Sequence, residues 1–177
     1  GVFLSWRLNA YEYDKDINFH IYRNGKRITD TPVTDSTNYF DSEGKAGDVY
    51  TVKAVKKGKI EKEGYTTKVI TGGYLSIPLD KPAPYTTPDG RVYEYTANDA
   101  SVADLDGDGE YEIVLKWDAG GHDNAHAGYT GIVYLDAYKL SGKKLWRINL
   151  GVNIRCGAHY TQFLVYDFDG DGKAEVI

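Results

Sequence analysis

The first 80 residues consist of short segments in which apolar side chains alternate with polar ones or run together. In order, the segments read VFLSWRL, INFHIYRNGKRI, TNYF, VYTVKAV and TKVI, and turn residues separate them. A period of two places alternate side chains on opposite faces, so each segment is predicted to be a β-strand. The pair Asn24-Gly25 between two β-forming runs is typical of a two-residue hairpin turn. The regular spacing predicts a β-sandwich of the immunoglobulin or fibronectin III type.

Three details of this sandwich follow from the same pattern. Trp6 and Tyr50 are the aromatic side chains expected in its core, whereas His20, which alternates with apolar neighbours, is expected to be exposed. Because Gly1 leads directly into a core-like run, the first strand of a complete sandwich is expected to be missing.

A proline-rich segment follows the sandwich. It begins at Leu79, reads LDKPAPYTTPDG, and contains three of the five prolines and an Asp-Gly pair. This composition is typical of a linker or of the start of a new domain. The β-forming runs after it are again short and separated by turn residues. We therefore expect two all-β domains, the sandwich over residues 1–80 and a second domain over residues 81–177.

The second domain contains one acidic phrase twice, DLDGDGEYE at 104–112 and DFDGDGKAE at 167–175. Each copy has carboxylates at its positions 1, 3, 5 and 9 and glycines at positions 4 and 6. Oxygen ligands at alternate positions of a loop can converge on one Ca²⁺ ion, and the glycines allow the positive φ angles of a tight wrap. The predicted ligand residues are Asp104, Asp106, Asp108, Glu110, Glu112, Asp167, Asp169, Asp171, Lys173 and Glu175.

The residues that flank the two copies also match. VADLDGDGEYEIV and VYDFDGDGKAEVI align apolar with apolar on both sides, so each copy reads as strand, loop and strand. No amphipathic helical pattern flanks either loop, which argues against an EF-hand. The spacing of the copies is somewhat longer than the roughly 40–50 residues of common propeller blades. A propeller blade with one long loop fits it.

An alternative for the two loops is a pair of acidic surface turns, since Asp-Gly is also a hairpin signal. Three aspartates at alternate positions followed by a glutamate favour cation binding. A loop with a full set of protein oxygens has little coordination capacity left for a substrate. The two ions are therefore expected to be structural, with a directly catalytic calcium as the other possibility.

Composition narrows the class of protein further. The net charge is −5 and the acidic residues gather in the two loops, which argues against a nucleic-acid-binding surface. No apolar run approaches the roughly 18 residues of a membrane span, and no signal segment opens the sequence. The single cysteine, Cys156, permits no internal disulfide and is expected to be a small buried side chain.

At the level of whole segments, the chain resembles the bacterial family 11 polysaccharide lyases, the rhamnogalacturonan lyases. The resemblance is carried by YTGIVYLDAYKLSGKKLWRINLGVNIRCGAHYTQFLVYDFDGDGKAE, by NDASVADLDGDGEYEIVLKWD and by the opening GVFLSWR. It implies a fibronectin-like sandwich followed by an eight-bladed β-propeller with many bound calcium ions, of which this chain contains the first blade or blades. It also implies cleavage of the rhamnosyl–galacturonosyl backbone of pectic rhamnogalacturonan I by β-elimination.

The same resemblance suggests two substrate-binding residues, Asn98 and Asp118, because an Asn and an Asp at matching positions lie in the family's substrate cleft. The alternatives are a turn-forming role for Asn98 and a strand-end cap for Asp118, and Asp118 could also ligate a second calcium. No catalytic base stands out, and the base is expected to lie beyond residue 177. The available cations, which the sequence does not rank, are Lys116, Lys139, Arg147 and Arg155.

Aromatic and histidine side chains offer weaker candidates. Those that could stack on sugar rings are Trp117, Tyr129 and Trp146, although Trp146 is better explained as a core residue. His122 and His126 lie in a glycine-rich loop without helical support, which argues against a zinc pair.

The predicted function is that of a calcium-dependent rhamnogalacturonan lyase that acts as a monomer on a pectic polysaccharide, with this chain inactive alone. The alternative is a non-enzymatic, calcium-stabilised β-propeller for adhesion or carbohydrate binding, because loops of the type DxDGDG also occur in repeats without catalysis. The long resemblance favours the lyase. An extracellular or periplasmic location is expected, because calcium loops and a single cysteine fit a calcium-rich exterior better than the cytosol.

Overall fold

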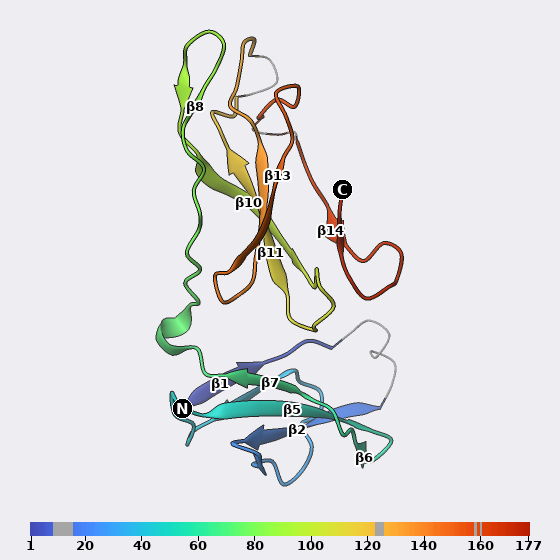
Figure 1. Ribbon diagram of the computed structural model, residues 1–177. Coiled ribbons are helices and arrows are strands. Elements are labelled where there is room, and N and C mark those ends of the chain that lie inside the picture. Colours follow the sequence, from blue (N-terminus) through green and yellow to red (C-terminus); the bar gives the residue numbers. More distant parts are fainter. Residues whose placement is uncertain (9–15, 123–125, 158, 160) are drawn as a thin grey trace. The chain divides into compact units, whose positions relative to one another are not determined.

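The computed structural model describes residues 1–8, 16–122, 126–157, 159 and 161–177, and the predicted all-β class is confirmed (Figure 1). Within these residues the one helical element is the short 3₁₀ turn η2, Thr71–Gly73. None of the described segments forms a helix long and apolar enough to cross a membrane. The chain divides into two compact units, Gly1–Leu75 and Ser76–Ile177.

The first unit is built from antiparallel strands. Their bounds are β1 Val2–Ser5, β2 Ile17–Arg23, β3 Lys26–Arg27, β4 Asn38–Asp41, β5 Val49–Lys56, β6 Lys59–Ile60 and β7 Tyr65–Lys68. One sheet has the order β3-β2-β5-β6, with β7 also paired to β5, and the other pairs β1 with β4. Asn24-Gly25 joins β2 to β3 with φ angles of +50° and +78°. Because the pair favours this left-handed geometry, the predicted hairpin forms.

A small core holds the first unit together. Leu4, Ile21 and Tyr50 are buried, and Trp6 packs against them as expected. The Tyr50 hydroxyl donates a hydrogen bond to Asp41 at 2.7 Å. Its phenol therefore buries its apolar ring and still finds a partner for its polar end.

His20 was expected to be exposed, and this expectation is wrong. Only 5% of the residue is exposed, and its ring lies 2.9 Å from the Thr29 hydroxyl. The middle three residues of β2 are all buried, because this strand has neighbours on both edges and both of its faces are covered there. An alternating pattern predicts one exposed face, and a central strand need not have one.

The second unit contains a four-stranded antiparallel sheet in which strands adjacent in sequence are adjacent in space (Figure 1). Its order is β10-β11-β12-β13, and two short hairpins, β8–β9 and β14–β15, accompany it. The bounds are β8 Tyr85–Thr86, β9 Val92–Tyr93, β10 Thr96–Ala103, β11 Glu112–Asp118, β12 Tyr134–Tyr138, β13 Lys144–Asn149, β14 Val165–Tyr166 and β15 Glu175–Val176.

Both faces of β11 are covered within the four-stranded sheet. Leu115 and Trp117 of β11 belong to one buried cluster, whereas Val114, between them and the loop, belongs to another that includes Leu135. Neighbouring residues of a strand point to opposite faces, so β11 is buried along most of its length. Candidate residues lie at both ends of this strand, Glu112 at its start and Asp118 at its end.

The first residues of the second unit pack on its four-stranded sheet. Ile77 contacts the cluster around Trp117, and the Asp80 backbone N–H donates to the Tyr138 hydroxyl at 3.1 Å. The units therefore divide at Leu75, ahead of the boundary at residue 80 that the prolines suggested.

Candidate functional site

The two acidic loops share one set of backbone hydrogen bonds. In the first loop, which joins β10 to β11, the Asp104 carboxylate accepts bonds from the N–H groups of both loop glycines, at 2.6 and 2.8 Å. In the second, which joins β14 to β15, Asp167 accepts the equivalent bonds at 2.7 and 3.0 Å. All four glycines have φ between +79° and +90°, where other residues are strained.

The ninth residue of each loop reaches back to brace its second residue. Glu112 accepts a hydrogen bond from the Leu105 N–H at 2.8 Å, and Glu175 accepts one from the Phe168 N–H at 2.9 Å. Glu112 is only 1% exposed, whereas Glu175 is half-buried. The repeated sequence thus produces a repeated loop, with the glutamate as its brace.

Three carboxylates converge in each loop. Within each group the candidate ligand atoms lie within 4.8 Å of one another, and the groups are Asp104, Asp106 and Asp108, and Asp167, Asp169 and Glu175. Hard oxygen ligands at this separation fit Ca²⁺, which accepts six to eight of them in flexible geometry. A cation would also offset the mutual repulsion of the carboxylates.

The remaining predicted ligands lie beside these groups. Glu110 and Lys173, at position 7, are exposed, and each donates its backbone N–H to the aspartate two residues earlier, Asp108 or Asp171. Asp171 and the brace Glu112 are not members of the converging groups. The structure therefore brings together six of the ten predicted ligands, three in each loop.

A lysine from another strand enters the first loop. Lys139, directly after β12, places its Nζ atom 2.7 Å from Asp106, 2.8 Å from Asp108 and 3.4 Å from Glu112. The hydrogen bonds that Lys139 donates to Asp106 and Asp108 raise the pKa of Lys139, and the bond that Asp108 accepts lowers the pKa of that carboxyl group. No local motif marks this residue, and the register of β11 with β12 brings it to the loop.

The two loops are neighbours in space. The Ala174 N–H of the second loop donates to the Asp104 carbonyl of the first at 2.7 Å. A Cβ atom built on Gly107 would lie 3.3 Å from the Lys173 side chain. The β14–β15 hairpin is thus attached to the four-stranded sheet at its acidic loop.

Asn98 and Asp118 lie on neighbouring strands at the opposite end of β11. Ala97 pairs with Trp117 and Ala100 with Leu115, so two residues of β10, Asn98 and Asp99, oppose the single residue between them. Two residues facing one define a β-bulge, a feature that re-aims side chains and is common beside functional sites. Asn98 is exposed at this bulge, and Asp118 is half-buried.

Asp118 ends its strand in a tight turn. Its Oδ1 atom accepts a hydrogen bond from the Gly121 N–H at 2.9 Å, as expected of a strand-end cap. A Cβ atom on Gly121 would lie 2.5 Å from the Asp118 carboxylate, so a larger residue there would displace this carboxylate. Nearby, Cys156 is buried as predicted and accepts a bond from the Ala119 N–H at 3.4 Å, and burial raises the pKa of its thiol.

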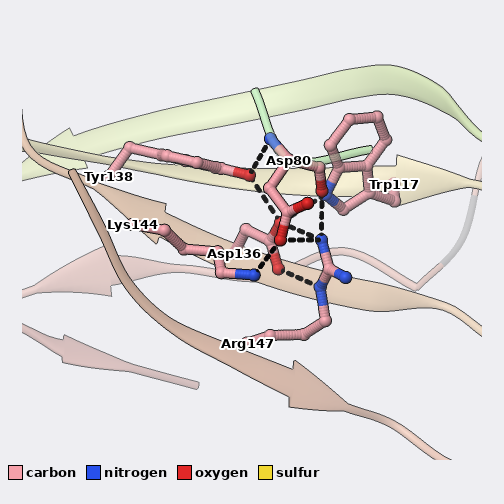
Figure 2. Close-up of polar contacts among 6 residues, drawn as sticks. All are labelled: Asp80, Trp117, Asp136, Tyr138, Lys144 and Arg147. Carbon is pink, nitrogen blue, oxygen red and sulfur yellow. Dashed lines mark hydrogen bonds and ion pairs between the residues drawn. The ribbon is translucent and has the colours of Figure 1, made fainter. Parts of the chain in front are cut away.

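A buried polar network crosses the same sheet (Figure 2). Asp136 is fully buried and accepts hydrogen bonds from Trp117, Tyr138 and Arg147 at 2.6–2.7 Å. Burial alone would raise the pKa of Asp136, but these bonds, led by that of Arg147, hold it below its usual value. Trp117 is only 2% exposed, so the expectation that it could stack on a sugar is wrong.

This network is structural. Burial and the bond to Asp136 raise the pKa of Tyr138 to about 12, so its hydroxyl stays protonated near neutral pH. That hydroxyl also accepts the Asp80 N–H, and the Asp80 side chain pairs with Lys144 (Figure 2). The network therefore fastens the start of the second unit to β12 and β13.

Comparisons with known proteins place this geometry in a family. Residues 74–177 match the family described as rhamnogalacturonan lyase family 11, C-terminal domain, and residues 1–70 match the rhamnogalacturonan I lyases beta-sheet domain. The chain belongs to rhamnogalacturonan lyase family 11. The resemblance inferred from the sequence is thereby confirmed.

Curated members of family 11 are similar over nearly the whole chain. The rhamnogalacturonan exolyase YesX of Bacillus subtilis (strain 168) is 58% identical over 177 residues, and the rhamnogalacturonan endolyase YesW of the same organism is 56% identical. A solved structure of the exotype lyase YesX matches 99% of this chain with a TM-score of 0.90. The chain spans 29% of the length of YesX and 28% of that of YesW.

Proposed function

We propose that the protein to which this chain belongs is a rhamnogalacturonan lyase that cleaves the backbone of rhamnogalacturonan I by β-elimination. The observation that carries the proposal is the identity of 58% and 56% to two lyases over 99% of the chain. One of these relatives is an exolyase and the other an endolyase, so the proposal concerns the reaction class that they share. The alternative of a non-enzymatic propeller is not favoured, because both relatives are lyases.

The reaction sets the requirements that such a protein must meet. β-Elimination removes the proton at C5 of a uronate and expels the oxygen at C4. The uronate carboxylate already carries a negative charge, so a cation or hydrogen-bond donors must stabilise the charge that develops beside it. A positioned base then takes the proton. We assign no base among the described residues and place it in the remainder of the protein.

Asn98 and Asp118 are proposed to bind the polysaccharide. Neighbouring strands carry them at one end of the four-stranded sheet, and the Asn98 side chain makes no hydrogen bond with any described residue. An exposed amide offers both a donor and an acceptor to sugar hydroxyl groups. Asp118 has one carboxylate oxygen held by the turn, which fixes its position.

The two acidic loops are proposed to hold structural calcium. Asp104, Asp106 and Asp108 would hold one ion, and Asp167, Asp169 and Glu175 the other. When bound, Ca²⁺ supplies charge compensation within each loop. Because the loops are joined by the bond from Ala174 to Asp104, ordering both fastens the β14–β15 hairpin to the sheet.

The finer architecture and setting are also proposals. The first unit fits a fibronectin III-like sandwich, since antiparallel strands in two sheets surround one core. The four-stranded meander fits a propeller blade. We further propose that the full protein acts outside the cytosol as a monomer, where calcium is abundant.

The reaction leaves an unsaturated uronate, whose ultraviolet absorbance provides the test. The full-length protein incubated with rhamnogalacturonan I should show a rise in this absorbance, and a calcium chelator should suppress it. The 1–177 chain alone should give no rise. The proposal of a lyase is wrong if the full-length protein produces no unsaturated uronate in the presence of calcium.

The role of Asn98 has a separate test. Asn98→Ala should raise KM about tenfold, as expected when an interaction used in substrate binding is lost.

A further inference from the structure

A buried lysine lies directly opposite the bulge that carries Asn98. Lys116 is 2% exposed, and the register of β10 with β11 places it across from Asn98 and Asp99. Its Nζ atom is 2.9 Å from the Asp99 carboxylate and 3.4 Å from the Thr161 carbonyl. The lysine side chain is 3% exposed, whereas that of Asp99 is 57% exposed.

Packing alone does not explain a lysine at this position. The residues around it on β11, from Val114 to Trp117, are otherwise apolar and buried, and its partner on β12 is Leu135. Burying an ammonium group costs more than burying an apolar side chain of similar size, even when the charge is paired. The ammonium group therefore has a role that an apolar side chain could not take, which is to bind the Asp99 carboxylate and the Thr161 carbonyl.

The ammonium group and its two partners belong to three separate segments. Asp99 is part of the bulge, Lys116 is two residues before Asp118 on the same face of β11, and Thr161 lies in a later loop. Thr161 has φ of +62°, an uncommon conformation for a β-branched residue. Its hydroxyl donates to the Arg155 carbonyl at 2.7 Å, so both polar ends of Thr161 are engaged.

We propose that Lys116 is a positioning residue of the carbohydrate site, whose buried ammonium fixes the Asn98 bulge relative to Asp118 and to the loop at Thr161. The inference rests on the proposed function, because it takes Asn98 and Asp118 as substrate-binding residues. Lys116 does not touch the polysaccharide, since its side chain is covered. It acts by preventing the bulge from shifting, and small displacements of positioning groups have large kinetic effects.

The test compares steady-state kinetics of full-length variants on rhamnogalacturonan I. Lys116→Met keeps the volume and removes the charge, and we expect KM to rise about tenfold with kcat changed less than about threefold, the signature of lost substrate binding. Lys116→Arg keeps a cation and should recover part of the loss. Asp99→Asn removes the partner at an exposed position, where the fold tolerates the change, and should raise KM in the same direction.

Lys144→Met is the matched control. Lys144 also pairs with an aspartate, Asp80, in the same unit but on β13, so its loss should leave KM unchanged. The proposal is overturned if Asp99→Asn and Lys116→Met keep the parental KM, or if Lys144→Met raises KM as much as they do. If Lys116→Met fails to fold, Asp99→Asn decides the matter alone. Asn98→Ala distinguishes failure of this proposal from failure of the proposed substrate site, because an unchanged KM for that variant would mean that Asn98 does not bind the substrate.

Discussion

The two acidic loops have the same sequence framework and share the backbone hydrogen bonds to their first and ninth residues, yet their surroundings differ. The first joins two long strands of the four-stranded sheet, and its brace Glu112 is buried. It also receives the ammonium of Lys139. The second joins two short strands, and among the described residues no lysine or arginine forms an ion pair with its carboxylates. Sequence spacing sets the form of each loop, whereas the neighbouring strands set its charge balance.

Calcium removal should expose this difference most strongly. A protein cation compensates part of the first loop's charge, so the second loop should depend more on the metal. With free calcium about 100 times the dissociation constant, its removal should speed amide exchange in the β14–β15 hairpin by about 100-fold. Residues 104–112 should change less. Hydrogen exchange of the full-length protein with and without a chelator measures both, and equal acceleration in the two loops would contradict the comparison.

The next largest effect should come from the two braces. Glu112→Ala removes a buried carboxylate that holds the Leu105 N–H and contacts Lys139, and should lower the local unfolding free energy by about 2 kcal/mol. Glu175→Ala removes the equivalent bond at a half-buried position and should cost less. Exchange of the β11 and β15 amides, measured without calcium, gives both values. A larger loss for Glu175→Ala would reverse the order of the two loops.

These contrasts show which features of the structure can be predicted from the sequence. The repeated carboxylates and glycines predict the loops because the hydrogen bonds that shape each loop lie within nine residues, as those of Asp104 and Asp167 illustrate. The Asn24-Gly25 hairpin is local in the same way. Lys139 could be named only as an available cation, since strand register brings it to Asp106 from a distant part of the chain.

The candidate substrate end of β11 was less accessible from sequence. Asn98 and Asp118 came from family resemblance, and nothing local announces a bulge at Asn98 and Asp99. Lys116 resembles any polar residue of an alternating strand, and its burial depends on the sheet around it. The prediction that His20 is exposed was wrong for the same reason. Burial of a polar residue on a central strand is a property of the tertiary structure.

A smaller effect should follow from loss of the lysine in the first loop. Lys139→Met removes a positive charge that competes with a metal for Asp106 and Asp108, so calcium should bind the first loop about tenfold more tightly. Calcium titration calorimetry of the full-length protein measures the change. The control is Lys143→Met, an exposed lysine of the turn between β12 and β13 that forms no ion pair with a described residue, and this change should leave both affinities nearly unchanged. If both substitutions tighten binding equally, Lys139 does not distinguish the loops.

The smallest effect tests the part of the comparison in which the loops should be the same. Gly109 and Gly172 occupy position 6 with φ of +86° and +90°, and a Cβ atom on either would meet no atom within 4 Å. Alanine at each site therefore adds backbone strain without a clash, and should cost about 1 kcal/mol in both loops. Local exchange in the presence of a chelator compares the two variants directly. Unequal costs would show that the neighbouring strands alter the loop backbone as well as its charge, and that the shared hydrogen bonds do not by themselves determine loop geometry.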